Sequence, residues 1–187
     1  PNAALDRTVV VPDFAAGAVY RAQQVSVVAG GKGMNVARAL QIFGSQVLCT
    51  GFIAGPSGKF FADIAEAEGF IGKWTNVAGD TRTCTSIADP NLGETTVVNE
   101  PGPTVTAADW QILQSDTLNA AADAAYICIS GSLPPGSPLD SFTSFIQAMP
   151  NNVWVDTSGA PLIAAVAAGP TGIKVNHLEA SVITEYQ

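Results

Sequence analysis

The stretch Ala29-Gly-Gly-Lys-Gly-Met-Asn-Val-Ala-Arg38 combines a glycine-rich turn with the start of a helix. The turn follows a predicted strand at 24–28, and the helix is predicted from about Met34, with Gly44 as its C-terminal stop. Glycines in such a turn leave backbone N–H groups free to point at an anion, and a helix N-terminus adds positive potential. The stretch therefore predicts a strand–turn–helix unit with a candidate anion site. The alternative is a flexible connection with an exposed Lys32.

Two well-known phosphate-binding loops do not match this turn. Gly33 follows Lys32 where a Walker A loop has Ser or Thr, and Val36 stands where the third glycine of a dinucleotide-binding fingerprint belongs. An NAD-binding domain is therefore disfavoured, and a failure of the protein to bind NADH would exclude it.

Outside this turn, the chain alternates helices and strands. From Ala107 onward the predicted order is α-β-α-β-α-β-α, which is typical of a parallel, doubly wound sheet. Two segments, 8–28 and 81–99, look like hairpins instead, and we expect them to form a small antiparallel layer beside the main sheet. Strands are predicted at 8–11, 24–28, 46–52, 81–88, 94–99, 125–129, 153–156 and 172–175, and helices at 34–43, 58–68, 107–122, 139–149, 161–168 and from Asn176.

Composition excludes several classes of protein. Hydrophobic residues make up 47% of the 187 residues, but no apolar run approaches the ~20 residues needed to cross a bilayer. The net charge is −8 and the 8 basic residues are scattered singly, so a nucleic-acid partner is not expected. Cys49, Cys84 and Cys128 are odd in number and far apart, which favours reduced thiols in a cytoplasmic protein over disulfides or a metal site.

Several polar residues at strand ends are candidates for ligand binding. Asp6 could accept hydrogen bonds from sugar hydroxyls, although a turn-forming Asp is the better local interpretation. Arg82 offers a fork of donors suited to phosphate, but alone it looks like a surface residue at a hairpin end. Ser130, Gly131 and Ser132 follow a buried strand, where ligands bind in open α/β sheets; a tight turn that caps the next helix is an equal alternative.

The segment Asn176-His-Leu-Glu179 also follows a predicted strand. Asn176 as N-cap and Glu179 at the third helical position are typical of a capping box. The alternative role for Glu179 is a carboxylate near Mg²⁺ and nucleotide phosphates.

Taken together, these stretches make the chain similar to the PfkB family of ribokinase-like kinases, and most similar to the branch of 1-phosphofructokinases and tagatose-6-phosphate kinases. The resemblance covers nearly the whole chain, and its motifs occur in the family's order. They are Asn2–Asp6, Gly30-Gly-Lys-Gly-Met-Asn35, Gly79-Asp-Thr-Arg82, Glu100-Pro-Gly-Pro103, Ser130-Gly-Ser-Leu-Pro-Pro-Gly136, Asp156-Thr-Ser-Gly159, and Lys174-Val-Asn176 with Glu179. Ala3 and Val175 depart from the family, which commonly has Pro at both positions.

The resemblance implies a fold and roles for the candidates. It implies one ribokinase-like domain over 1–187, a three-layer αβα fold with a mainly parallel sheet and a small antiparallel β-lid that closes over the sugar. It further implies that the glycine turn at 30–33 and the side chains of Asp6, Lys32 and Arg82 converge on one pocket for a phosphorylated sugar. The implied sugar-phosphate contacts are Asp6, Gly30, Gly31, Lys32, Gly33, Asn35, Arg82, Ser130, Gly131 and Ser132; those for ATP and Mg²⁺ are Lys174, Asn176 and Glu179, the last also a metal ligand, either directly or through water.

The resemblance also implies an activity: transfer of a phosphoryl group from ATP to a ketohexose phosphate such as fructose 1-phosphate, with a homodimer formed through the lid. The family's Gly-x-Gly-Asp segment, which carries the catalytic base, does not occur here. We therefore expect the base beyond Gln187, a chain truncated at both ends, and no catalysis by this chain alone. The alternatives are a kinase acting on tagatose 6-phosphate, fructose 6-phosphate, a neutral sugar or a nucleoside, and a non-catalytic sugar-phosphate-binding protein.

Overall fold

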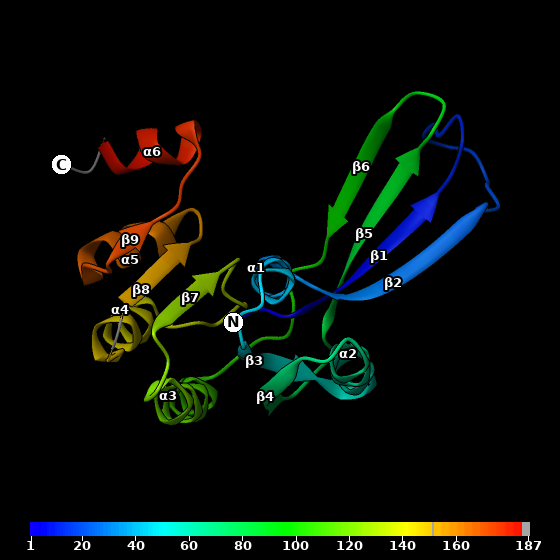
Figure 1. Cartoon of the computed structure of the whole chain (residues 1–187). Coiled ribbons are helices and arrows are strands. Elements are labelled where there is room, and N and C mark those ends of the chain that lie inside the picture. Colours follow the sequence, from blue (N-terminus) through cyan, green and yellow to red (C-terminus); the bar gives the residue numbers. More distant parts are fainter. Residues whose placement is uncertain (151, 185–187) are drawn as a thin grey trace.

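The computed structural model describes residues 1–150 and 152–184, which form nine strands and six helices in this part of the chain (Figure 1). The strands are β1 (Ala4–Val10), β2 (Gln24–Gly30), β3 (Leu48–Ala54), β4 (Ile71–Val77), β5 (Arg82–Asp89), β6 (Glu94–Asn99), β7 (Tyr126–Ser130), β8 (Asn152–Asp156) and β9 (Gly172–Ile173). The helices are α1 (Lys32–Ile42), α2 (Gly55–Ala67), α3 (Ala107–Ala121), α4 (Leu139–Ala148), α5 (Ala160–Ala168) and α6 (His177–Thr184).

The body of the molecule holds two groups of parallel strands. β3 pairs with β4, and β7, β8 and β9 pair in that order, every pair being parallel. Asn2 forms a single parallel bridge to Phe52 in β3, so the N-terminus lies between the two groups (Figure 1). The parallel, doubly wound arrangement predicted from the alternation after Ala107 is confirmed.

Helices cover both faces of these strands. One core cluster joins β7 and β8 to α3, α4 and α5, and the other joins α1 to α2. β3 contributes to both clusters because its side chains alternate: Phe52 packs in the first and Ile53 in the second. A strand buried on both faces is expected for a parallel sheet between two helical layers, so the fold is three-layered.

The remaining four strands form a sheet in the order β2-β1-β5-β6, which extends away from the body (Figure 1) and which we call the lid. β1 pairs antiparallel with β2, and β5 with β6, as the hairpin patterns predict. The central pair, β1 and β5, is parallel, so the lid is mixed rather than purely antiparallel. Both strands leave the body at their first residue, Ala4 and Arg82, and therefore run outward in the same direction.

Asp89 holds the outer end of the lid together. Its carboxylate accepts hydrogen bonds from the backbone N–H of Phe14 at 2.7 Å, of Asn91 at 2.9 Å and of Leu92 at 3.2 Å. Burial alone would raise the pKa of Asp89, but these backbone donors hold it below its usual value. One buried carboxylate thus ties the β1–β2 connection to the turn between β5 and β6.

The sequence patterns missed one strand and shifted several boundaries. β4 was not predicted, because Gly72 and Lys73 interrupt its apolar pattern. Gly72 is required there: a Cβ at this position would lie 2.2 Å from the indole Nε1 of Trp74. β1 begins at Ala4 rather than at residue 8, and α1 begins at Lys32 rather than at Met34. The single-domain assignment of 1–187 stays a prediction. No helix among the described residues has both the length and the apolar character that a membrane crossing requires.

Replacing Phe142 by alanine tests the larger core. Phe142 is fully buried and packs edge-on against Trp110, with ring centroids 6.1 Å apart. Phe142→Ala should lower the free energy of unfolding by about 3–5 kcal/mol, measured by urea denaturation. Phe43→Ala is the control, since Phe43 is 85% exposed, and should change it by less than ~0.5 kcal/mol. Equal effects of the two substitutions would contradict the described core.

Candidate functional site

The strand register places three predicted site residues on one face of the lid, close to the body. Ala4 lies opposite Gly30 on one side and Arg82 on the other, so Gly30 and Arg82 lie in the same row across the sheet. Asp6 is two residues further along β1 and therefore on the same face. Burial is the first cause that raises the pKa of Cys84; the charge of Arg82 opposes this rise, and the charges of Asp6 and Glu100 add to it.

Asp6 is packed directly against the glycine turn. Its Oδ2 accepts a hydrogen bond from the backbone N–H of Gly31 at 3.2 Å. A Cβ on Gly30 would lie 2.0 Å from the Cγ of Asp6, so only glycine fits at position 30. Gly31 has φ of 89°, a conformation that other residues rarely adopt, and it is the N-cap of α1. No side chain caps α1, so N–H groups of its first turn remain available to an anion.

Arg82 and Asn2 connect the lid to the body. The guanidinium of Arg82 donates to the carbonyl oxygens of Asn2 at 3.2 Å and of Glu100 at 3.3 Å. The side-chain amide of Asn2 donates to Ser132 Oγ at 3.1 Å and to the carbonyl oxygen of Pro101 at 3.0 Å. We call Asn2, Asp6, Gly30, Gly31, Arg82 and Ser132 the lid-base cluster. Within it, the buried Oδ1 of Asn2 and Nε of Arg82 have no hydrogen-bond partner among the described residues.

A second group lies at the carboxyl ends of β7 and β8. The carboxylate of Asp156 binds Lys32 Nζ at 3.0 Å and Lys174 Nζ at 3.3 Å, and its backbone oxygen accepts from Gly131 at 2.8 Å. Burial alone would raise the pKa of Asp156, but the hydrogen bonds and charges of the two lysines hold it below its usual value. Asp156, Lys32 and Lys174 form the lysine–aspartate cluster. The side chains of both lysines are more than half exposed and so can reach a ligand.

The side chains of Asn35, Asn176 and Glu179 form hydrogen bonds outside these two clusters. Asn35, in the first turn of α1, accepts a hydrogen bond from Arg38 at 3.1 Å. Asn176 and Glu179 bond each other reciprocally, each backbone N–H donating to the other's side chain at 2.9 Å, which confirms the capping box. Among the residues that the structure describes, no three ligating side chains gather as a metal site would need. A Mg²⁺ role for Glu179 stays a prediction.

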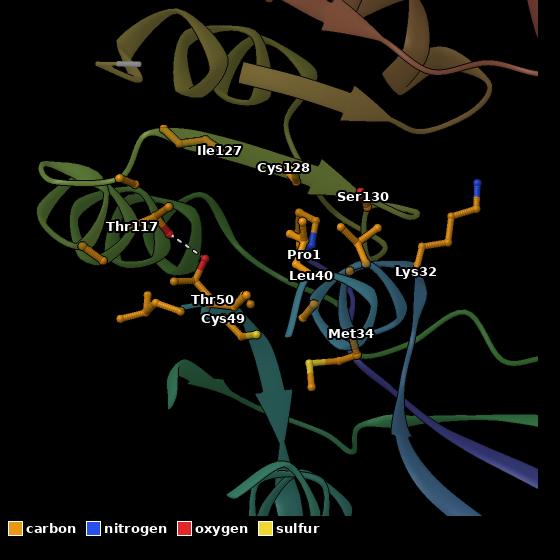
Figure 2. A pocket seen from close by; sticks show the side chains of 18 of the residues that line it. Pro1, Lys32, Met34, Leu40, Cys49, Thr50, Thr117, Ile127, Cys128 and Ser130 are labelled. Carbon is orange, nitrogen blue, oxygen red and sulfur yellow. Dashed lines mark hydrogen bonds between the residues drawn. The ribbon is translucent and has the colours of Figure 1, made fainter. Parts of the chain in front are cut away.

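The body contains a groove of about 860 Å³, which we call the central groove (Figure 2). Its walls come from the first four residues of β3 and from β7, and α1 and α3 also line it. Gly30, Gly31, Lys32, Gly33 and Ser130 lie along it, whereas Asp6 and Arg82 do not. A hydrogen bond joins Asp6 to the glycine turn, and another joins Arg82 to Asn2. The convergence of Asp6, Lys32 and Arg82 on one sugar pocket stays a prediction.

The sequence analysis did not single out Asn2 or Asp156 as site residues. Both lie in motif stretches that carry the resemblance, and Asp156 ends a predicted strand, as other candidates do. Their importance is visible only in three dimensions, because each bonds residues more than 15 positions away in the chain. Polar residues at the carboxyl ends of predicted parallel strands are the signal that could have found Asp156.

A family model described as the pfkB family carbohydrate kinase matches residues 2–187 of the chain. A protein named 1-phosphofructokinase from Xanthomonas campestris pv. campestris is 37% identical over 176 residues, which are 92% of this chain and 55% of that protein. A tagatose-6-phosphate kinase from Staphylococcus epidermidis is 30% identical over 191 residues, covering 100% of this chain and 61% of the relative. The chain thus spans little more than half the length of these relatives.

Solved structures show the same similarity. Phosphofructokinase-2 from Escherichia coli in complex with fructose-6-phosphate superposes with a TM-score of 0.91 at 26% identity, over 98% of this chain and 62% of the other. A structure described as a possible 1-phosphofructokinase from Thermotoga maritima gives a TM-score of 0.86 at 27% identity, over 94% and 58%. The predicted ribokinase-like three-layer fold is therefore confirmed.

Replacing Gly30 by alanine tests the contact with Asp6. Because the added Cβ would overlap the Asp6 carboxylate, Gly30→Ala should lower the free energy of unfolding by about 1–3 kcal/mol in urea denaturation. Gly33→Ala is the matched control: its Cβ would lie 3.7 Å from the nearest described atom, the oxygen of Ser130, and should be tolerated.

A double-mutant cycle isolates the cause. In an Asp6→Ala background, which removes the overlapping carboxylate, Gly30→Ala should cost at least about 1 kcal/mol less than in the wild type. An equal cost in both backgrounds would show that Asp6 is not what excludes a side chain at position 30.

Proposed function

The chain belongs to the pfkB family of carbohydrate kinases, and we propose on that premise that the whole protein is a sugar-phosphate kinase. The proposed reaction transfers the γ-phosphoryl group of ATP to a hydroxyl of a ketohexose phosphate, with fructose 1-phosphate as substrate and fructose 1,6-bisphosphate as product. The relatives named 1-phosphofructokinase support this substrate. Tagatose 6-phosphate is the second candidate, supported by the relative from Staphylococcus epidermidis.

One observation carries the proposal: Asp6, Gly30 and Arg82 share the inner end of one lid face, beside the uncapped N-terminus of α1. A sugar phosphate needs carboxylate acceptors for its hydroxyls and cationic or N–H donors for its phosphate. The lid-base cluster offers both kinds of group. Lys32, which pairs with Asp156, can instead bind a phosphate oxygen through its ammonium group.

We assign the following roles within this chain. Asp6 accepts hydrogen bonds from sugar hydroxyls, while Lys32 and Arg82 contact the substrate's own phosphate. The remaining sugar contacts are Gly30, Gly31, Gly33, Asn35, Ser130, Gly131 and Ser132. Lys174, Asn176 and Glu179 face the nucleotide, with Mg²⁺ met by Glu179 through water. ATP would supply the phosphoryl group, and the general base would lie in a part of the protein outside this chain.

The proposed place of action is the cytoplasm. Cys49, Cys84 and Cys128 are all free thiols in the structure, and burial raises the pKa of each, so none is activated toward disulfide exchange. This state suits a reducing compartment.

The direct test is a panel of sugar phosphates offered with ATP and Mg²⁺ to the full-length protein, with ADP release as the readout. Fructose 1-phosphate should give the highest kcat/KM in the panel. ADP release that no sugar phosphate stimulates would contradict a kinase of this class and favour a non-catalytic sugar-phosphate-binding protein.

Lys32→Ala and Arg82→Ala in the full-length protein should each raise the KM for the sugar phosphate at least tenfold. Loss of one charge-assisted hydrogen bond costs about 1.5–3 kcal/mol, and 1.4 kcal/mol is a factor of ten. Lys59→Ala is the control, because Lys59 pairs with Asp63 on the surface of α2. A KM unchanged in both site variants would indicate a neutral sugar or nucleoside as substrate.

We also propose that the lid forms a homodimer. Val28 and Val97 are 40% and 53% exposed and, by register, lie on the lid face that bears Asp6. A second copy that covered these valines would bury them and close the same face. A similar protein, phosphofructokinase-2 from Escherichia coli, has a tetrameric inhibited form and so self-associates.

Val97→Lys should shift the full-length protein toward monomer in analytical ultracentrifugation, raising the dimer Kd at least tenfold, because a charge would be buried against the partner. Ile112→Lys on α3 is the control, since Ile112 is equally exposed, at 53%, but lies on the body. Dissociation by Ile112→Lys alone would place the interface on the body instead.

A further inference from the structure

The side chain of Arg38, in α1, is held on several sides by other elements. Its Nε and Nη2 donate to the two carboxylate oxygens of Glu68 at 2.6 Å and 3.0 Å, a forked pairing that fixes the plane of a guanidinium. Nη2 also donates to the carbonyl oxygen of Ala29, and the guanidinium lies over the ring of Phe70, 5.9 Å from its centroid. Arg38 is therefore fixed between the end of β2 and the end of α2.

This arrangement directs the remaining nitrogen of the guanidinium, Nη1, at Asn35. Nη1 donates to Oδ1 of Asn35 at 3.1 Å. A guanidinium carries only donors, so the oxygen of the amide, and not its nitrogen, must face Arg38. The NH₂ group of Asn35 is therefore turned away from Arg38. Asn35 is exposed, so this group can reach a ligand.

The orientation of this amide matters because of where Asn35 lies. It belongs to the first turn of α1, whose N-terminus has no side-chain cap and offers backbone N–H groups to an anion. With its NH₂ group outward, Asn35 adds donors beside these N–H groups. A rotated amide would present its oxygen instead, and would repel the acceptor oxygens of a phosphate or a sugar.

We propose that Arg38 is a positioning residue for the ligand site: it holds the amide of Asn35 so that Asn35 donates hydrogen bonds to an oxygen of the substrate. Glu68, at the end of α2, keeps Arg38 in place for this purpose. The inference rests on the proposed function, in which Asn35 contacts a sugar phosphate, and it adds which end of the Asn35 amide meets the substrate.

The contact between Arg38 and Asn35 has little structural value of its own. The pair of Arg38 with Glu68 already ties α1 to α2, whereas Asn35 and Arg38 belong to the same helix and lie three positions apart. Exposed pairs at this spacing add little to the stability of a helix. The main consequence of the contact is the orientation of the amide.

A double-mutant cycle in the full-length protein tests the proposal, with the Kd of fructose 1-phosphate measured by isothermal titration calorimetry. Arg38→Ala should raise this Kd at least about fivefold in the wild-type background, but less than about twofold in an Asn35→Ala background, because Arg38 acts through Asn35. An equal rise in both backgrounds would overturn the proposal and leave Arg38 with a structural role alone.

Asn35→Asp tests the donor role directly. A carboxylate keeps one oxygen toward Arg38 but puts a second, negatively charged oxygen in the place of the NH₂ group. The Kd should therefore rise at least about tenfold, and more than in Asn35→Ala. Binding as tight as in the wild type would show that the Asn35 amide does not donate to the substrate, and would overturn the proposal.

Glu68→Gln takes the place of Arg38→Ala in the cycle if the latter does not fold. It removes the charge that holds Arg38 but leaves an acceptor, and should raise the Kd at least about twofold in the wild-type background and not in the Asn35→Ala background. Glu66→Gln is the matched control, since Glu66 is exposed on the same helix, and should leave the Kd unchanged. An equal effect of the two glutamate substitutions would contradict a specific role for Glu68 and Arg38.

The measurements on the wild type separate this inference from the proposed function. A protein that binds fructose 1-phosphate without releasing ADP refutes the kinase activity, while the cycle on Kd still decides the role of Arg38. A protein that binds no sugar phosphate refutes both.

Discussion

The contact between the carboxylate of Asp6 and the turn at Gly30 and Gly31 constrains the geometry around it. The carboxylate occupies the space that any larger residue at position 30 would need, and it accepts the N–H of Gly31. Since Asp6 belongs to β1 and the turn leads from β2 into α1, this contact fixes the lid base and the start of α1 relative to each other. The direction of α1, and with it the groups at its N-terminus, depends on two glycines and one carboxylate.

The same constraint explains how an acidic chain can present a positive site. With a net charge of −8, the chain cannot rely on overall charge to attract an anion. Lys32 enters the lysine–aspartate cluster because Gly31 turns the backbone just before it, while Asp156 partly neutralises Lys32 and Lys174. A phosphate that displaced Asp156 would exchange one anion for another, so specificity depends on the geometry of the donors rather than on their number.

The fold could be predicted wherever a local pattern decides it. Alternating elements after Ala107, the two hairpins and the capping box of Asn176 each follow from short-range chemistry. β4 could not be recognised because it lacks an apolar pattern: Gly72 stands where a side chain would collide with the indole of Trp74. The parallel pairing of β1 with β5 was equally hidden, since it joins residues that are 78 apart in the chain, as Ala4 and Arg82 are. Long-range pairing is what sequence patterns do not encode.

The position of the central groove links the packing of the body to the candidate site. α1 and α2 cover one face of the body, α3, α4 and α5 cover the other, and the central groove lies between β3 and β7. In open α/β sheets ligands bind at the carboxyl ends of the strands, and members of both clusters lie at the ends of β3, β7 and β8. Asn2 contacts Phe52 in β3, Ser132 after β7 and Arg82 in the lid. The packing around the groove therefore sets the position of Asn2, and a well-packed core at this point is a condition for a well-ordered site.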